Sequence, residues 1–211
     1  MAQANLRRDR YHHGDLANAL TVAATDLARQ GGPEAVVLRE AARQVGVSAT
    51  AAYRHFAGHG DLIREVKERC QAALAEHMRA EVDAGEPAAD PRQEAVRRLR
   101  ALGRGYIGFA LAEPGLFRTA FCHAESPREK GFEMFGSPAF AMLSAVLDEL
   151  AALGLITPAN RPYTETVAWS SAHGLAALLV DGPLTGLPDE QREAAIERTL
   201  DATVAGICTA V

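Results

Sequence analysis

Apolar residues recur at intervals of three and four along most of the chain, the spacing of one face of an α-helix. Clusters of glycine and proline separate these stretches, as at Gly31-Gly32-Pro33 and Glu113-Pro114-Gly115. No stretch requires a β-strand, and no internal repeat appears. The pattern therefore predicts an all-α protein, with helices near residues 15–31, 36–45, 49–56, 61–84, 91–113, 116–121, 138–153, 162–180 and 189–210.

The helical stretches fall into three parts. Residues 1–60 contain three short helices behind an arginine-containing arm, which is either a solvated tail or a DNA contact. Residues 61–84 form one long connecting helix. A proline-rich linker, 85–91, then opens a larger helical part that extends to residue 211.

Residues 36–60 have the pattern of two short helices joined by a tight turn. Gly46 suits a left-handed helix end, and Ser48 suits the N-cap of the next helix. Ala52 and Phe56 of this second helix are four residues apart and are expected to face the core. Its outward side would carry Thr50, Tyr53, Arg54 and His55. Such a helix could read the DNA major groove, or the pair could be an ordinary helical hairpin.

The charge distribution gives mild support to DNA binding. The net charge is −5, but residues 1–70 carry 10 basic and 8 acidic residues, whereas the remainder is strongly acidic. A basic end on an acidic body suits a nucleic-acid-binding head. The three widely spaced cysteines and the polar N-terminus indicate a reducing cytoplasm with no signal peptide, and no apolar run is long enough for a membrane span.

The two-helix stretch resembles the helix-turn-helix of the tetracycline-repressor (TetR) family of bacterial transcriptional regulators. The matching segments are 38–42 (LREAA), 46–48 (GVS), 53–56 (YRHF) and 61–63 (DLI), and residues 11–16 (YHHGDL) also resemble the start of such proteins. The resemblance implies a homodimer that binds double-stranded DNA at a palindromic operator, with a larger C-terminal domain for effector binding and dimerisation. The implied function is a repressor released by a small apolar or amphipathic effector.

Matching positions also suggest roles for individual side chains. The resemblance implies base contacts by Arg39, Thr50 and Arg54, which suits the pairing of arginine with guanine edges. It implies phosphate contacts by Ser48, Tyr53 and His55, whereas Ala49 offers only an apolar contact. His59 departs from the family, which commonly has lysine there, so its phosphate contact depends on protonation.

Residues 169–175 (WSSAHGL) resemble the W-H-G signature of one effector-domain subgroup of the family. A set of aromatic and polar side chains could line an effector cavity or simply fill the core: Tyr106, Phe109, Phe117, Phe121, Phe135, Phe140, Met142, Trp169 and His173. The stretch 167–180 is apolar nearly all round, which predicts burial on two sides, either in a dimer or at the centre of a monomer. The dimer-interface candidates are Gly174, Ala177, Leu178, Ile196, Leu200 and Val204.

Two other classes of protein compete with this interpretation. A helical metal-dependent enzyme would use pairs such as His55 with His59 or Cys122 with His123, but neither pair has a third ligand at a suitable spacing. A constitutive architectural DNA-binding protein would have a filled effector domain. We expect a non-enzymatic cytoplasmic regulator with no cofactor, no metal and no membrane partner.

Overall fold

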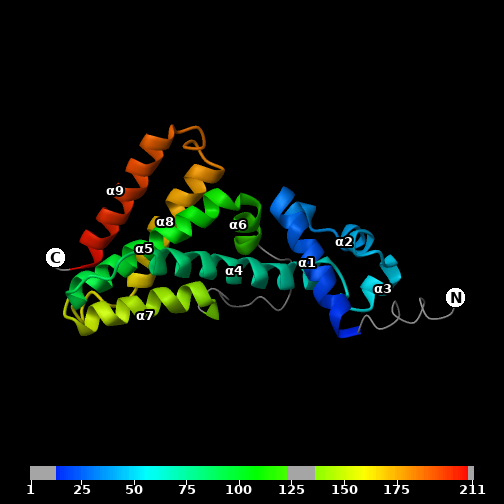
Figure 1. Cartoon of the computed structure of the whole chain (residues 1–211), viewed down its shortest axis with the longest axis horizontal. Coiled ribbons are helices and arrows are strands. Elements are labelled where there is room, and N and C mark those ends of the chain that lie inside the picture. The colour runs from blue at the N-terminus through cyan, green and yellow to red at the C-terminus, as the bar shows by residue number, and fades with distance from the viewer. Residues whose placement is uncertain (1–12, 123–135, 209–211) are drawn as a thin grey trace. The chain divides into compact units, whose positions relative to one another are not determined.

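The computed structural model describes residues 13–122 and 136–208, and every regular element in these ranges is a helix (Figure 1). The all-α prediction is therefore confirmed. The chain divides into two compact units, which are described separately. The N-terminal unit comprises residues 1–70 and 115–129, and the C-terminal unit comprises residues 71–114 and 130–211.

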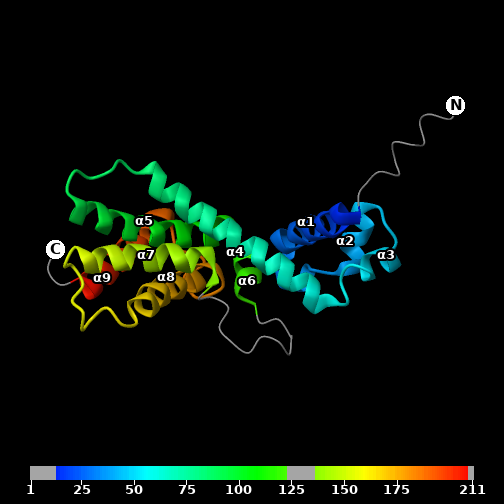
Figure 2. The same ribbon diagram turned by 90° about the horizontal axis from the view of Figure 1, so that it is seen from below.

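The N-terminal unit packs short helices around the first half of a long one. Its elements are α1 (His13–Gly31), the 3-10 turn η1 (Pro33–Ala35), α2 (Leu38–Val45), α3 (Ala49–Tyr53), the start of α4 (His59–Ala84) and α6 (Pro114–Phe121). Figure 2 shows α1, α2 and α3 side by side in this unit. Leu20 of α1 and Leu62 and Val66 of α4 are fully buried in the core of this unit.

Gly115 lets α6 approach the end of α1 closely. A Cβ added at this residue would lie 2.3 Å from the carbonyl oxygen of Ala28 and 2.5 Å from that of Arg29. Only glycine leaves room for these backbone atoms. From the sequence, residues 114–121 were expected in the C-terminal part. The packing of α6 on α1 was not anticipated, because it joins segments that are far apart in the chain.

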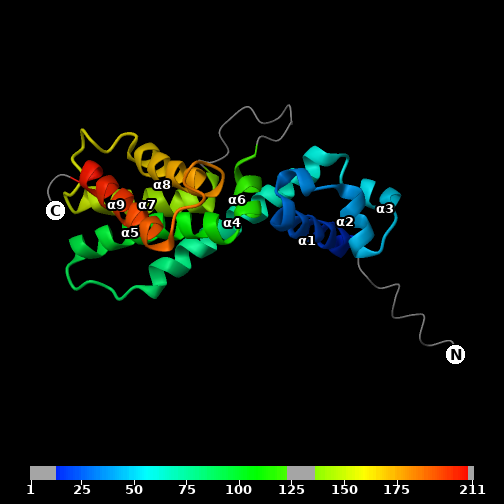
Figure 3. The ribbon, with the colours of Figure 1, turned by 90° about the horizontal axis from the view of Figure 1, so that it is seen from above.

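The C-terminal unit is a bundle in which α5 touches most of its neighbours. It contains the end of α4, then α5 (Pro91–Ala112), α7 (Pro138–Ala152), α8 (Thr164–Val180) and α9 (Asp189–Ile207). Helix α5 packs against α7, α8 and α9, and α8 also packs against α9 (Figure 3). Asp90 caps α5 by accepting a hydrogen bond from the Arg92 N–H, and Ser137 caps α7 in the same way from Phe140.

Helices α4 and α5 cross at a second glycine. A Cβ at Gly105 would lie 2.7 Å from the Cα of Met78, so a larger residue would separate the two backbones. At the same crossing, Nδ1 of His77 lies 3.0 Å from the Gly105 carbonyl oxygen. This contact fixes the C-terminal half of α4 against the bundle.

Candidate DNA-binding surface and C-terminal interior

The turn between α2 and α3 has the geometry predicted from its sequence. Gly46 adopts a left-handed conformation with φ of 79°, and the Val47 N–H donates to the Ala42 carbonyl oxygen at 3.0 Å. Ser48 Oγ then accepts a hydrogen bond from the Ala51 N–H at 3.2 Å. Both the glycine turn and the serine N-cap are confirmed.

The inner side of the hairpin is anchored in the core. Ala41 and Ala42 of α2 are buried, and Ala52 and Phe56 are buried behind α3, as predicted. Helix α3 itself ends at Tyr53, three residues earlier than expected. The chain still turns inward after it, since the His55 and Phe56 N–H groups both donate to the Ala52 carbonyl oxygen.

The outer side presents the candidate DNA contacts to solvent. Ala49 is half-buried, and the remaining candidates are all exposed: Arg39, Ser48, Thr50, Tyr53, Arg54, His55 and His59. On α2, Arg43 is held by Glu40 at 2.6 Å, which lowers the pKa of that carboxyl group. Within residues 13–122 and 136–208, neither Arg39 nor Arg54 has an acidic partner. Their guanidinium groups are available to a ligand outside the chain.

The candidates in the C-terminal unit centre on a hydrogen bond between α5 and α8. Tyr106 Oη lies 2.7 Å from His173 Nδ1. Burial raises the pKa of Tyr106 and lowers that of His173, so both groups are neutral near pH 7. In this neutral pair either the phenol donates to Nδ1 or a protonated Nδ1 donates to Oη, according to the tautomer of the imidazole.

Trp169 lies beside this pair, one helical turn before His173. Its ring meets Tyr106 edge-on with centroids 5.1 Å apart, and Phe140 lies on another side at 6.2 Å. A small apolar cavity adjoins Tyr106 and Trp169, with a volume of about 40 Å³. Sites for small molecules usually enclose about 300–1,000 Å³, so this interior is almost filled by side chains.

Several predicted cavity residues lie elsewhere. Phe117 and Phe121 pack on each other in the N-terminal unit, with ring centroids 5.2 Å apart. Phe109 is buried against His77, and Met142 is half-buried without lining the cavity. Phe135 lies outside the described residues. Of the eight candidates that the structure describes, only Tyr106 and Trp169 line the cavity, with Phe140 and His173 in contact with them.

Most of the cavity wall was missed because it consists of ordinary core residues. The wall is completed by Met78, Leu99, Arg100, Leu102, Gly103, Leu143, Ala168, Ala172, Leu200, Thr203 and Val204. The prediction selected residues by their aromatic character. The lining of the cavity is instead decided by which faces of α5, α8 and α9 pack together. The helical spacing of Leu99, Leu102 and Tyr106 on one face of α5 was a usable signal.

Helices α8 and α9 leave an apolar strip exposed on the surface of the C-terminal unit. Gly174, Ala177 and Leu178 are exposed, as is Val167, at 49%. On α9, Ala194, Ala202 and Ala205 are exposed as well. Ile196 and Leu200, two other interface candidates, are buried in the protomer's own core, and Val204 is half-buried at the cavity. These three face inward because α9 lies on α5.

A helix-turn-helix whose outer side exposes two arginines without acidic partners among the described residues, attached to a helical bundle, is the arrangement expected of a DNA-binding regulator. No group of three His, Cys, Asp or Glu side chains among the described residues could hold a metal ion. Likewise, none of the helices in those ranges has the length and hydropathy needed to cross a bilayer.

Comparisons with known proteins agree with this class. Residues 20–66 match the family described as bacterial regulatory proteins, tetR family, and residues 99–203 match the tetracyclin repressor-like C-terminal domain. No curated protein matches the chain. The chain belongs to the TetR family and is a DNA-binding transcriptional regulator.

Solved structures share the whole fold. A protein of unknown function from Rhodococcus sp. RHA1 is 25% identical with a TM-score of 0.74, covering 95% of this chain and 100% of the other. A TetR-family transcriptional regulator from Haemophilus influenzae is 17% identical with a TM-score of 0.62 and the same coverage. A further TetR-family regulator, from Marinobacter aquaeolei, is 17% identical with a TM-score of 0.61, covering 92% and 97%.

Proposed function

We propose that the protein is a homodimeric repressor that a small molecule releases from a palindromic operator. The observation that carries the proposal is the outward side of α3 and α2, where Arg39 and Arg54 are exposed and have no acidic partner among the described residues. Each protomer would place α3 in a major groove, with half-sites about one helical turn apart. The chain acts in the cytoplasm and has no catalytic role.

The side chains divide into those that read bases and those that set position. Arg39 and Arg54 pair with guanine edges, and Thr50 contacts a neighbouring base. Ser48, Tyr53, His55 and His59 contact phosphates, which fix the register without reading sequence. Ala49 touches a thymine methyl group. The exposed hydroxyl and imidazole groups support these assignments.

The exposed strip on α8 and α9 supports dimerisation. Leu178 and Val167 are large apolar side chains with 43% and 49% of their surface exposed. Beside them, Gly174 and Ala177 are small enough for another helix to approach closely. Two copies of α8 and α9 would bury these residues in a twofold four-helix bundle.

Helix α4 contributes one side chain, Met78, to the wall of the cavity. The first half of this helix is part of the N-terminal unit. A ligand that enlarges the cavity would press on Met78 and so on the C-terminal half of α4. Such a ligand releases the operator only if it binds more tightly to the conformation whose DNA-binding heads are wrongly spaced.

The decisive experiment is selection of bound sequences from a random DNA pool, followed by fluorescence anisotropy on the recovered palindrome. Tyr53→Ala should weaken binding to cognate and scrambled DNA alike, because it removes a phosphate contact. Arg54→Ala should cost about 1–3 kcal/mol on cognate DNA and relax selectivity at one base position. Arg79→Ala, which removes an exposed arginine of the C-terminal unit, is the charge-matched control. Equal losses on both DNAs for Arg54→Ala would refute its base contact.

A constitutive DNA-binding protein without an effector is the second candidate, and the nearly filled cavity favours it. In that case operator affinity would stay constant across a panel of metabolites. Release of the operator by any small molecule that also binds the isolated protein would exclude it.

A further inference from the structure

The small cavity adjoins a larger cleft on the surface of the C-terminal unit. The cleft has a volume of about 330 Å³ and lies among α4, α5 and α9. Arg100 and Leu200 line both the cleft and the cavity. These two side chains therefore form the partition between the cleft and the apolar interior.

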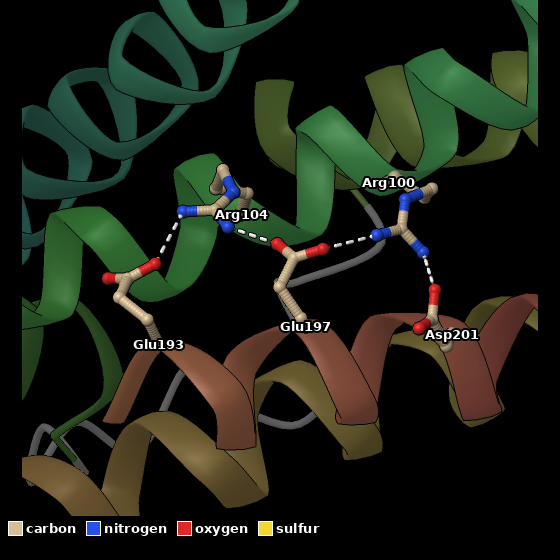
Figure 4. Close-up of polar contacts among 5 residues, drawn as sticks. All are labelled: Arg100, Arg104, Glu193, Glu197 and Asp201. Carbon is tan, nitrogen blue, oxygen red and sulfur yellow. Dashed lines mark hydrogen bonds and ion pairs between the residues drawn. The ribbon is translucent and has the colours of Figure 1, made fainter. Parts of the chain in front are cut away.

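Three arginines of α5 line the cleft: Arg97, Arg100 and Arg104. Their spacing of three and four residues puts them on one face of the helix. Arg97 is occupied, since it forms a paired contact with Glu94 and also donates to the Val82 carbonyl oxygen. Arg100 and Arg104 face the carboxylates of α9 (Figure 4).

Glu197 bridges these two arginines. Each of its carboxylate oxygens accepts a hydrogen bond from one arginine, at 2.5 Å from Arg100 and in close contact with Arg104. Each arginine also has a second partner, Asp201 for Arg100 and Glu193 for Arg104 (Figure 4). Glu197 can therefore turn into solvent without leaving either guanidinium group unpaired.

We propose that the effector is a small monocarboxylate with a short apolar tail. Its carboxylate takes the place of Glu197 between Arg100 and Arg104, since guanidinium groups bind carboxylates with paired, directional hydrogen bonds. The tail passes Arg100 and Leu200 and ends in the cavity beside Tyr106 and Trp169. The small volume of the cavity restricts the tail to a few carbons. This inference rests on the proposed function, because it supplies the chemical class of the effector.

Binding of this kind would also change how α9 is held on α5. The native bridge joins Glu197 to both arginines, so a competing carboxylate removes one of the links between the two helices. Asp201 and Glu193 still hold α9 on α5 after this exchange, and Leu200, about one turn after Glu197, lies beside the vacated position.

The test uses isothermal titration calorimetry on the full-length protein with three probes. Acetate supplies the head alone, 1-hexanol the tail alone, and hexanoate both. Hexanoate should bind at least tenfold more tightly than either fragment. Arg100→Gln should weaken hexanoate binding about tenfold and leave hexanol binding nearly unchanged, because it removes a charged hydrogen bond. Glu197→Gln should tighten hexanoate binding several-fold, because a neutral amide at position 197 competes less well than a carboxylate for Arg100 and Arg104.

Arg98→Gln is the matched control, since Arg98 lies on α5 but pairs with Glu149 of α7 and does not line the cleft. It should bind hexanoate like the native protein. Hexanoate binding no tighter than hexanol binding, or unaltered by Arg100→Gln, would overturn the proposal. If Arg100→Gln does not fold, Glu197→Gln decides, and unchanged or weaker hexanoate binding by that variant would overturn it.

Operator binding measured without any ligand separates the two proposals. If the protein binds its operator but not hexanoate, the inference about the effector fails and the DNA-binding function stands. If hexanoate binds at the arginines while no DNA duplex is bound, the site stands and the proposed function fails.

Discussion

Replacing Gly115 by alanine tests whether α6 is seated on the last turn of α1. The added Cβ would lie 2.3 Å and 2.5 Å from two carbonyl oxygens of α1, and 2.9 Å from a carbonyl carbon. Ordinary van der Waals contact begins near 3.4 Å, so α6 must withdraw by roughly an ångström. All three obstructing atoms belong to the backbone, which cannot rotate away as a side chain would.

The withdrawal would loosen the buried residues that follow on α6. Leu116, Phe117 and Thr119 are at most 4% exposed, so a shift of this size costs them dispersion contacts. Overpacking typically costs about 1–3 kcal/mol. The higher helix propensity of alanine offsets little of this free-energy cost, because Gly115 is near the start of α6. We expect Gly115→Ala to destabilise the protein by about 2–3 kcal/mol.

Guanidinium unfolding followed by circular dichroism measures this cost. Gly206→Ala is the control, since Gly206 also lies in a helix but a Cβ there meets nothing within 4 Å. That change should be neutral or stabilising by up to about 1 kcal/mol. A Gly115→Ala variant as stable as the native protein would refute the close approach of α6 to α1.

The remaining predictions concern the dimer, pH and DNA. Leu178→Glu should convert the proposed dimer to a monomer in analytical ultracentrifugation, because it would put a charge in the proposed apolar interface. Val22→Glu, at the same 43% exposure on α1, should not. Burial lowers the pKa of His173 in the folded state, so its contribution to stability is complete above about pH 6.5 and is lost as the pH falls. His173→Asn should therefore show a smaller drop in guanidinium midpoint between pH 7.5 and 5.5, and identical drops would contradict this. Arg39→Ala should weaken cognate binding by about 1–3 kcal/mol and scrambled binding much less, as measured by anisotropy.

The local features of the N-terminal unit could be predicted because each depends on neighbouring residues. Gly46 turns the chain, Ser48 caps α3, and Ala52 and Phe56 face inward, all within one hairpin. Helix ends were less certain. Helix α3 ends at Tyr53 with Arg54 as its C-cap, although the apolar spacing continues to Phe56.

The interior of the C-terminal unit could be predicted only in part. Trp169 and His173 share a helix face, so their proximity followed from spacing. The partner of His173, Tyr106, is 67 residues away, and only the packing of α5 on α8 brings the two together. Similarly, Phe117 and Phe121 lie in the N-terminal unit and not in the C-terminal one, because Gly115 allows α6 to pack closely on α1. Such pairings between distant segments leave no periodic trace in the sequence.

In the α2–α3 hairpin, the side chains that stabilise the fold are different from those that are exposed to solvent. Its buried side, with Ala42, Ala52 and Phe56, holds the hairpin in place, while Thr50 and Arg54 project outward with no structural duty among the described contacts. Mutations at these two outward positions can therefore accumulate without unfolding the hairpin. Under the proposed function, a change of target sequence would then require only the exchange of these two surface residues, with the buried side of the hairpin left as it is.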